Sequence, residues 1–448
     1  MIPLRWEEIE ALRLGELSGP PADRVVHRVH DDSRAARPGD LFVALNSGVG
    51  YVGDALDRGA AALVPDDQEA ALAALAALVR ARSDARVVAV VGSTGKTSTK
   101  DALAALCSAV TPTVAAAASR NNELGLPLTV LRLEPDTHVL VAEMGMRGLG
   151  QIAELCAIAR PEVALVTSIG PEHLELVGTV ADVARANAEA IGALPAGGIA
   201  VVPADAPELE AWLGRTDIDV RRFDRRTVER LPLGPAADSS WARSSWRFRV
   251  PSGGGAAGDH VELELTLPFD QRHMAENVLA ALTAYHALGL PLERAQEGAA
   301  AIRLSAWRAD VRPLPGGGLV VNDAYNANPT SMRAALDDLA ERAAGRRTVA
   351  ILGEMAELGD AASAYHAAVG EQLGALGVDV VVGVGPPARA YLEGLRAVTA
   401  WIASAEGFSE VADLVRPGDC VLVKASRAVG LEGIASEIEK RARTWSAS

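Results

Sequence analysis

A glycine-rich turn between an apolar stretch and an alanine-rich stretch is the clearest chemical feature of the sequence. Residues 87–106 read VVAVVGSTGKTSTKDALAAL, which predicts a strand, a turn and a helix in that order. Backbone N–H groups at the start of such a helix point toward a bound anion. We therefore predict a phosphate-binding loop in which Lys96 reaches the outer phosphates of a nucleotide and the Thr97 hydroxyl binds magnesium. The predicted nucleotide-contacting residues of this loop are Gly92, Ser93, Thr94, Gly95, Lys96, Thr97 and Ser98.

This turn meets only part of the full phosphate-loop pattern. The full pattern places a glycine five positions before Gly95, and this chain has Val90 there. A plain strand-to-helix turn with a solvated lysine also fits these residues. The apolar strand before the turn and the helix after it favour the phosphate-binding interpretation.

Two side chains at the ends of other predicted strands could join this loop. Glu143 ends the apolar run THVLVAE, and His173 follows the run EVALVTSIG. Because parallel strands bring their carboxyl ends to one edge of a sheet, both side chains are expected at that edge. A carboxylate and an imidazole beside Thr97 would suit a magnesium–nucleotide site. A histidine after Gly-Pro also fits a loop residue that makes one backbone hydrogen bond.

A pair of amides offers a further candidate for substrate binding. Asn121 and Asn122 lie on a predicted turn within SRNNELGLPLTVL. Neutral amides can orient a substrate carboxylate or phosphate without adding charge, and asparagine pairs also serve turns. Both interpretations remain open from the residues alone.

The order of predicted elements indicates an α/β fold with three domains. Residues 1–84 form a small N-terminal α/β domain that we interpret as a substrate module. Residues 85–303 form a central ATP-binding domain with a mostly parallel sheet, followed by a hairpin of WRFRV and HVELELTLP. Residues 304–448 form a Rossmann-like domain without the G-x-G-x-x-G pattern of dinucleotide sites. We expect the ligand to bind between the second and third domains.

Composition excludes several classes of partner. The formal net charge of −15 argues against a nucleic-acid backbone as the main partner. No apolar run approaches the roughly 20 residues that span a bilayer, and MIPLRWEEIE lacks the apolar segment of a signal peptide, so we expect a cytoplasmic protein without membrane insertion. Cys107, Cys156 and Cys420 are far apart in apolar surroundings, which predicts buried reduced thiols.

Seven motifs give the chain a family resemblance. The chain contains, in this order, GSTGKTSTKD, NNELGLPLTV, EMGMRGLGQI, SIGPEHLE, VNDAYNANPTSMRAAL, LGEMAELG and VLVKASRAVGLE. It thereby resembles the Mur ligases over essentially its whole length, most nearly the MurF branch, which joins D-alanyl-D-alanine to UDP-N-acetylmuramoyl-tripeptide in peptidoglycan and cell-wall synthesis. The motifs DAYNANP and LGEMAELG are the most specific for this resemblance.

The resemblance implies a chemistry and a set of residues. ATP would phosphorylate the carboxylate of a small-molecule acid, and an amino acid or dipeptide amine would attack the acyl phosphate. We expect a monomer with ATP and Mg²⁺ as cofactors. The implied catalytic residues are Lys96, His173 and Arg308, and the implied magnesium ligands are Thr97, Glu143 and His173. The implied nucleotide contacts outside the loop are Asn277, on the adenine side, with Arg308, Asp323, Tyr325, Asn326 and Asn328. The implied substrate contacts are Ser33 and Arg34 for UDP, Asn121 and Asn122, and Lys424, Ser426 and Arg427 for the carboxylate of the amino component.

Several of these residues also have ordinary structural interpretations. Asn326, Asn328 and Pro329 could form a helix-entry turn, and Arg308 could be a surface residue after a domain joint. Glu354, Glu357 and His366 are weaker candidates, because acidic loop residues and helical histidines commonly face solvent.

The chain departs from the family pattern at two places. Members usually follow LFVAL with a longer loop ending in DGHDF, whereas this chain has LFVALNSGVGYV, with Ser47, Val49 and Gly50 at polar positions. Asn187 stands where many Mur ligases carry a carbamylated lysine that helps to hold a second magnesium ion. Glu189 cannot replace it directly, because residues two apart do not share a helix face.

Two further functions therefore stay open. A relative could join a different acid and amine in a specialised pathway. A nucleotide-binding regulator could keep the fold without turnover, although the presence of Lys96, Glu143 and His173 argues against it.

Overall fold

The computed structural model describes residues 1–232, 243–253 and 259–445. Its contacts divide the chain into two compact units. Unit 1 comprises Met1–Thr167, Arg185–Pro268 and Glu276–Arg303. Unit 2 comprises Ser168–Ala184, Phe269–Ala275 and Leu304–Ser448.

The N-terminal part of unit 1 holds a mixed sheet of four strands in the order β2-β6-β5-β4. The strands are β2 (Gly15–Ser18), β4 (Arg28–His30), β5 (Asp40–Val43) and β6 (Ala61–Pro65), with a separate antiparallel pair of β1 (Leu4–Arg5) and β3 (Val25–Val26). The apolar run LFV of β5 is completely buried, because β5 lies inside the sheet. The helices here are α1 (Trp6–Leu12), α2 (Val52–Asp57) and α3 (Gln68–Arg80).

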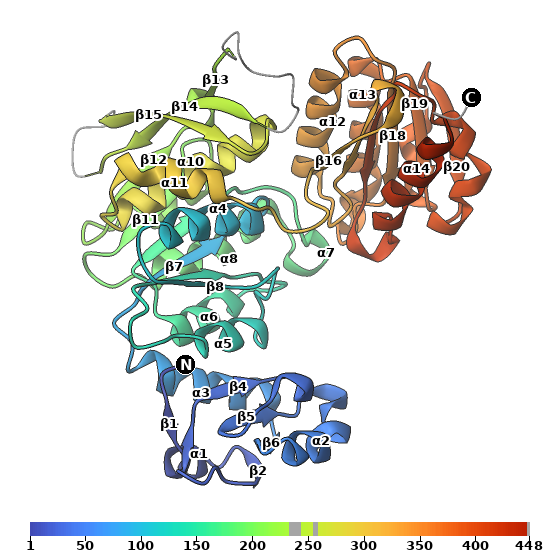
Figure 1. Ribbon diagram of the computed structural model, residues 1–448. Coiled ribbons are helices and arrows are strands. Elements are labelled where there is room, and N and C mark those ends of the chain that lie inside the picture. Colours follow the sequence, from blue (N-terminus) through green and yellow to red (C-terminus); the bar gives the residue numbers. More distant parts are fainter. Residues whose placement is uncertain (233–242, 254–258, 446–448) are drawn as a thin grey trace. The chain divides into compact units, whose positions relative to one another are not determined.

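The middle of unit 1 is a parallel sheet of six strands in the order β12-β11-β10-β7-β9-β8 (Figure 1). Its strands are β7 (Arg86–Val91), β8 (Thr113–Ala115), β9 (Val139–Glu143), β10 (Val163–Val166), β11 (Ile199–Pro203) and β12 (Asp219–Phe223). Nearly every residue of β7, β9 and β10 is buried, as expected for central strands covered on both faces. Their carboxyl ends therefore place Gly92 and Glu143 at one edge of the sheet.

An antiparallel sheet of three strands follows, in the order β13-β14-β15. Its strands are β13 (Glu229–Arg230), β14 (Ser244–Pro251) and β15 (His260–Leu267). Trp246, Phe248 and Val250 alternate with more exposed residues along β14, as a sheet with one covered face requires. The predicted hairpin is thus confirmed in its strands, whereas positions 254–258 of its turn lie outside the described residues.

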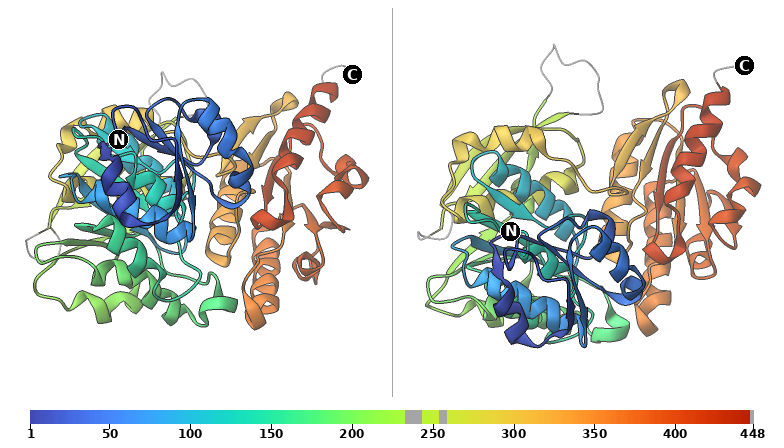
Figure 2. Two further views of the ribbon diagram at one scale, coloured as in Figure 1. Left: turned by 90° about the horizontal axis from the view of Figure 1, so that it is seen from below. Right: turned by 60° about the horizontal axis from the view of Figure 1, so that its bottom comes forward.

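Unit 2 contains a second sheet of six strands in the order β16-β17-β21-β18-β19-β20, in which only β16 runs antiparallel to its neighbour. Its strands are β16 (Asp310–Pro313), β17 (Leu319–Asn322), β18 (Thr348–Gly353), β19 (Val380–Val384), β20 (Val398–Ile402) and β21 (Cys420–Lys424). Val421 and Val423 pack in one core with α14, the red helix of Figure 2. Leu422 points to the opposite face, since successive strand residues alternate.

The remaining helices cover these sheets. They are α4 (Lys96–Ser108), α5 (Gly125–Val130), α6 (Gln151–Ala159), α7 (Leu174–Val177), α8 (Val180–Gly192), α9 (Glu210–Leu213), α10 (Arg272–Ala287), α11 (Ala295–Ala301), α12 (Pro329–Ala343), α13 (Ala362–Leu376) and α14 (Glu432–Trp445). The predicted α/β fold class is confirmed. Within the described residues, no helix is both long and apolar enough to cross a membrane.

The three cysteines are buried free thiols, as predicted. Burial raises the pKa of each thiol to about 12, so these sulfurs stay protonated near neutral pH.

Candidate active site

The turn from β7 to α4 has the backbone of a phosphate-binding loop. Gly92 and Gly95 both adopt positive φ, at +124° and +86°. A Cβ atom on Gly95 would lie 2.4 Å from the amide oxygen of Asn277 on α10, so a larger residue would have to displace that side chain as well as adopt an unfavourable φ. The helix α4 begins directly after this glycine, at Lys96. Its first N–H groups can therefore face a bound phosphate.

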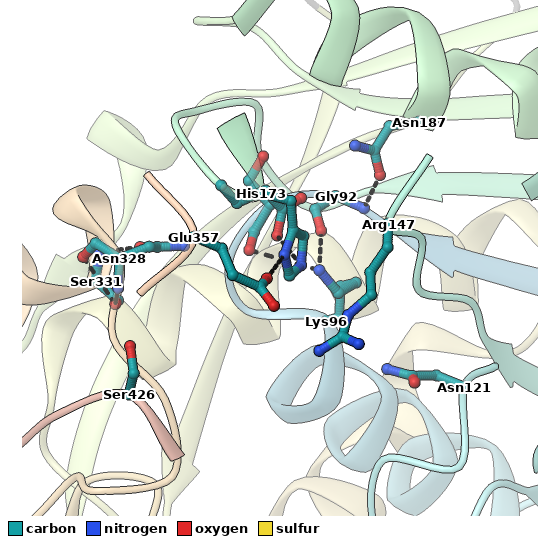
Figure 3. A network of polar contacts seen from close by, with 12 residues as sticks. Gly92, Lys96, Asn121, Arg147, His173, Asn187, Asn328, Ser331, Glu357 and Ser426 are labelled. Atoms are coloured by element: carbon teal, nitrogen blue, oxygen red, sulfur yellow. Dashed lines mark hydrogen bonds and ion pairs between the residues drawn. The ribbon is translucent and has the colours of Figure 1, made fainter. Parts of the chain in front are cut away.

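Two side chains from neighbouring elements hold the loop. The side-chain oxygen of Asn187, on α8, accepts a hydrogen bond of 2.6 Å from the Gly92 N–H (Figure 3). The Thr167 hydroxyl, directly after β10, lies 2.7 Å from the carbonyl oxygen of Thr94 and 3.1 Å from that of Val91. Because Asn187 and Thr167 are both buried, these contacts are shielded from water and fix the loop on both sides.

The Lys96 side chain folds back over the loop. Its ammonium group donates to the carbonyl oxygen of Gly92 and lies 3.5 Å from that of Ser93 (Figure 3). The positive charge therefore lies against the backbone of the turn. Its contact with the outer phosphates stays a prediction.

Thr97, Glu143 and Asn121 come together at the end of β9. The Thr97 hydroxyl donates to Oε1 of Glu143 over 3.0 Å, and the Asn121 amide donates to the same oxygen over 2.8 Å. Glu143 is 1% exposed, and its second oxygen, Oε2, is buried without a hydrogen-bond partner among the described residues. A buried carboxylate oxygen of this kind is stabilised when it binds a cation or accepts a hydrogen bond.

These residues fit a magnesium ion. Mg²⁺ takes oxygen ligands and is usually bound by one or two protein oxygens together with water and substrate phosphates. The Thr97 hydroxyl and the Glu143 carboxylate are such a set, beside a phosphate loop. No cluster of three or more His, Cys, Asp or Glu side chains suited to a metal occurs in the described part of the chain.

The other polar residues of this region serve the backbone. The Asn122 side chain accepts from the Gly125 N–H, 3.0 Å away, and so caps the entry to α5. Glu189 accepts from the N–H groups of Gly150 and Ala153, at 2.7 and 3.0 Å, at the start of α6. Glu189 thus stabilises the start of α6, whereas Asn187 contacts the phosphate loop.

The two implied UDP contacts lie in the N-terminal domain. The Ser33 hydroxyl donates to Asp54 over 2.8 Å. Arg34 forms a fork with Asp32, and this hydrogen bonding lowers the pKa of the Asp32 carboxyl to about 2. The shortened loop forms a 3-10 helix over Asn46–Tyr51, in which Val49 and Tyr51 are exposed.

His173 belongs to unit 2 and contacts Glu357. Its Nδ1 is hydrogen-bonded to Oε2 of Glu357 (Figure 3). Its Nε2 lies 3.9 Å from Oε2 of Glu172. The backbone N–H of Glu175 donates to the Glu357 carbonyl oxygen over 3.1 Å, which joins the same two segments. Glu357 therefore orients the imidazole of His173. The sequence suggested only that Glu357 faces solvent.

Lys424 and Ser426 are buried in unit 2. The ammonium group of Lys424 lies 2.6 Å from Asp323 and 2.9 Å from the carbonyl oxygen of Asn326. The Ser426 hydroxyl accepts from the Ala356 N–H over 2.8 Å and lies 3.2 Å from the Ala327 carbonyl oxygen. Both side chains thus brace the loops that carry the motifs DAYNANP and LGEMAELG.

Both candidate arginines of unit 2 lie over aromatic rings. The guanidinium of Arg308 is 4.0 Å from the ring centroid of Tyr325, and that of Arg427 is 4.5 Å from the ring centroid of Trp307. Arg427 also forms an ion pair of 2.8 Å with Glu432. These contacts hold the planar cations in defined orientations.

Two candidates have clear structural roles. Asn328 caps α12, where its side-chain oxygen accepts from the Ser331 N–H over 2.8 Å, so the helix-entry interpretation is confirmed for this residue (Figure 3). The solvent-facing expectation for His366 is wrong: its ring is buried, stacks on Tyr391 and accepts from the Met355 N–H over 3.1 Å. A histidine four residues into a helix gives no sequence sign of this packing.

The sequence missed several residues of the site. Thr167, Trp307 and Glu432 were not selected, Glu357 was only a weaker candidate, and Asn187 was noted only as a missing lysine. The position of Thr167 directly after a central strand was an available signal. The other contacts join segments far apart in the chain, which no local pattern predicts.

Comparisons with known proteins bear on all of these regions. The model of the Mur ligase middle domain matches residues 90–285, and that of the Mur ligase glutamate ligase domain matches residues 307–427. The UDP-N-acetylmuramoyl-tripeptide–D-alanyl-D-alanine ligase of Escherichia coli (strain K12) is 34% identical over 87% of this chain and 88% of its own length.

Solved structures give the same result. Crystal structure I of MurF from Acinetobacter baumannii has a TM-score of 0.81 and 27% identity and covers 98% of this chain and 99% of its own. The MurF ligase from Thermotoga maritima in complex with ADP has a TM-score of 0.77 and 26% identity, over 93% of this chain and 98% of its own. The resemblance inferred from the seven motifs is thus confirmed over nearly the whole length, and the chain belongs to the Mur ligase family.

Proposed function

We propose that the protein is an ATP-dependent, ADP-forming ligase that adds D-alanyl-D-alanine to UDP-N-acetylmuramoyl-tripeptide in the synthesis of peptidoglycan precursors. The observation that carries this proposal is the phosphate loop with the Thr97–Glu143 pair at its end. The chain that contains it is similar over most of its length to UDP-N-acetylmuramoyl-tripeptide–D-alanyl-D-alanine ligases. The ADP complex of the Thermotoga maritima relative supports ATP as the nucleotide.

In this proposal the loop activates a carboxylate. A carboxylate oxygen of the tripeptide attacks the γ-phosphorus of ATP, and ADP leaves. The amine of the dipeptide then attacks the acyl carbon, loses a proton, and phosphate leaves with the former carboxylate oxygen. The N–H groups at the start of α4 and the ammonium group of Lys96 stabilise charge on the transferring phosphoryl group.

Magnesium is the metal that the residues fit. The Thr97 hydroxyl and Oε2 of Glu143 would hold it, while Asn121 keeps the carboxylate in place through Oε1. When bound, the ion would neutralise charge on the phosphate oxygens. His173 stays a proposed contributor, oriented by Glu357.

The remaining assignments rest on the resemblance. We propose that Asn277 lies on the adenine side, that Arg308, Asp323, Tyr325, Asn326 and Asn328 contact the nucleotide, and that Ser33 and Arg34 serve the UDP group. Residues 1–84, 85–303 and 304–448 would then act as substrate, ATP and amino-component domains. The substrates are small molecules drawn from cytoplasmic pools, and no step requires a second copy of the chain.

A second candidate function is a ligase for another acid and amine. The observation that favours it is the altered segment Asn46–Tyr51, where Ser47, Val49 and Gly50 replace polar positions of the usual loop. Recognition of UDP would then be lost while the phosphate chemistry stayed the same.

An ADP-release assay with omitted components tests the proposal. The complete mixture contains ATP, Mg²⁺, UDP-N-acetylmuramoyl-tripeptide and D-alanyl-D-alanine, and the Lys96→Ala variant serves as the inactive control. ADP release that needs both the acid and the amine supports the proposal. Release with another acid, and with no UDP-muramyl peptide, would establish the second candidate instead.

A further inference from the structure

Trp307 adopts a backbone conformation that a bulky residue rarely takes. Its φ is +60°, and Ala309, two residues later, has φ of +50°. Left-handed backbone is unfavourable for a tryptophan and persists only where the surroundings fix it. Such positions concentrate at sites with a function.

Hydrogen bonds fix this segment against the motif DAYNANP. The Tyr325 N–H donates to the Trp307 carbonyl oxygen over 3.1 Å, and the Ala309 N–H donates to Asp323 over 3.0 Å. Because both ends are tied down, the half-buried indole ring has a defined position.

The ring supports the guanidinium of Arg427. The central carbon of that group lies 4.5 Å from the ring centroid, and Nη1 lies 2.8 Å from Oε1 of Glu432. About half of the Arg427 side chain, 51%, is exposed. An arginine has five N–H donors in one plane, so the ion pair leaves donors of this cation for a second anion.

We propose that Trp307 positions the guanidinium of Arg427 to receive the terminal carboxylate of the incoming amino component. This inference rests on the proposed function, which supplies a dipeptide as that component. A guanidinium held in one plane suits bidentate binding of a carboxylate. The carboxylate is the only anionic group of the dipeptide, since the peptide bond is neutral and the amine is either neutral or cationic. Trp307 acts through Arg427 and is a positioning residue.

The same unit contains a matched control. Arg389 lies 3.8 Å from the ring centroid of Trp401, whose indole N–H donates to the Gly385 carbonyl oxygen over 2.8 Å. Trp401→Leu removes a tryptophan–arginine contact whose distance is similar to that between Trp307 and Arg427, and it does not involve Arg427. It separates a general loss of stability from the loss of the carboxylate site.

The test compares the KM for D-alanyl-D-alanine with the KM for its C-terminal amide, in the wild type and in Trp307→Leu, Trp307→Phe, Arg427→Ala and Trp401→Leu. The wild type should prefer the free carboxylate, and Trp307→Leu should reduce this preference about three- to thirtyfold, the range of an arginine–aromatic contact. Trp307→Phe keeps an aromatic face and should retain most of the preference. Trp307→Leu should have no further effect in the Arg427→Ala background, and Trp401→Leu should match the wild type.

The outcomes are distinct for the two proposals. A wild type that turns over the dipeptide, with Trp307 variants that keep the full carboxylate preference, overturns the positioning role alone. Equal changes in Trp307→Leu and Trp401→Leu also overturn it. If Trp307→Leu does not fold, Trp307→Met, which also lacks an aromatic ring, takes its place, and an unaltered KM ratio with a lower kcat counts against the proposal. A wild type without any turnover of the dipeptide contradicts the proposed function itself and with it the carboxylate role.

Discussion

The side-chain oxygen of Asn187 accepts a hydrogen bond from the backbone N–H of Gly92, over 2.6 Å and in a buried environment. This contact ties α8 to the first glycine of the phosphate loop. Replacing Asn187 with leucine leaves a buried N–H without its acceptor, which costs about 1–3 kcal/mol. We expect Asn187→Leu to raise the KM for ATP about tenfold or more, by the same estimate. Steady-state kinetics with varied ATP measures this.

A control on the same helix separates this effect from a change in α8 itself. Glu189→Gln alters the start of α6 and leaves the Asn187 contact in place. Its KM for ATP should match that of the wild type. Equal KM values in the two variants would show that Asn187 does not fix the loop.

The same asparagine predicts an insensitivity to carbon dioxide. A carbamate forms on an uncharged lysine amine, and the amide nitrogen of Asn187 is a poor nucleophile. Its side chain is also engaged with Gly92. Turnover should therefore be the same in carbon-dioxide-depleted buffer and with added bicarbonate. Stimulation of the wild type by bicarbonate would contradict this description of the site.

Glu143 should set the magnesium requirement. Glu143→Gln keeps the size of the side chain but removes the charge that favours a divalent cation. We expect the magnesium concentration for half-maximal activity to rise about tenfold or more, since a charged partner is worth about 1.5–3 kcal/mol. Binding of Mn²⁺, followed by its paramagnetic signal, should weaken in parallel. Asn122→Ala, which alters only the cap of α5, is the matched control. Unchanged metal binding in Glu143→Gln would place the ion elsewhere.

Local chemistry could be predicted from sequence, and long-range contacts could not. The strand, glycines and helix around Lys96 lie within one short stretch, so the pattern predicts the loop. Glu143 could be placed beside it, because parallel strands share an edge. The contact between Asn187 and Gly92 depends on how α8 packs, which a helical pattern does not specify. The pairing of Trp307 with Arg427 likewise joins residues 120 positions apart.

His273 should make unfolding sensitive to acid. Burial lowers the pKa of its imidazole from 6.5, although Asp338 and Asp323 partly oppose this, while Lys424 and Arg342 reinforce it. Below about pH 6.5 the unfolded chain binds a proton that the folded chain takes up only at lower pH, so stability falls as pH falls. The slope from this one group is at most about 1.4 kcal/mol per pH unit.

Denaturant unfolding between about pH 7.5 and pH 5.5 measures this slope. His273→Gln removes the titrating group and should lose less stability over that range than the wild type. The partly buried His286, whose pKa is also lowered by burial, is the same in both proteins and cancels in the comparison. Equal slopes for the two proteins would exclude His273 as the sensitive group.

In the proposed reaction, the phosphate loop activates a carboxylate as an acyl phosphate. The most direct measurement follows oxygen from an acid substrate whose reacting carboxylate carries the heavy oxygen isotope. Each turnover should transfer one labelled oxygen to the released phosphate, detected by mass spectrometry, with unlabelled ADP and one new amide bond. Release of unlabelled phosphate, in a reaction that still forms the amide, would contradict the acyl-phosphate route.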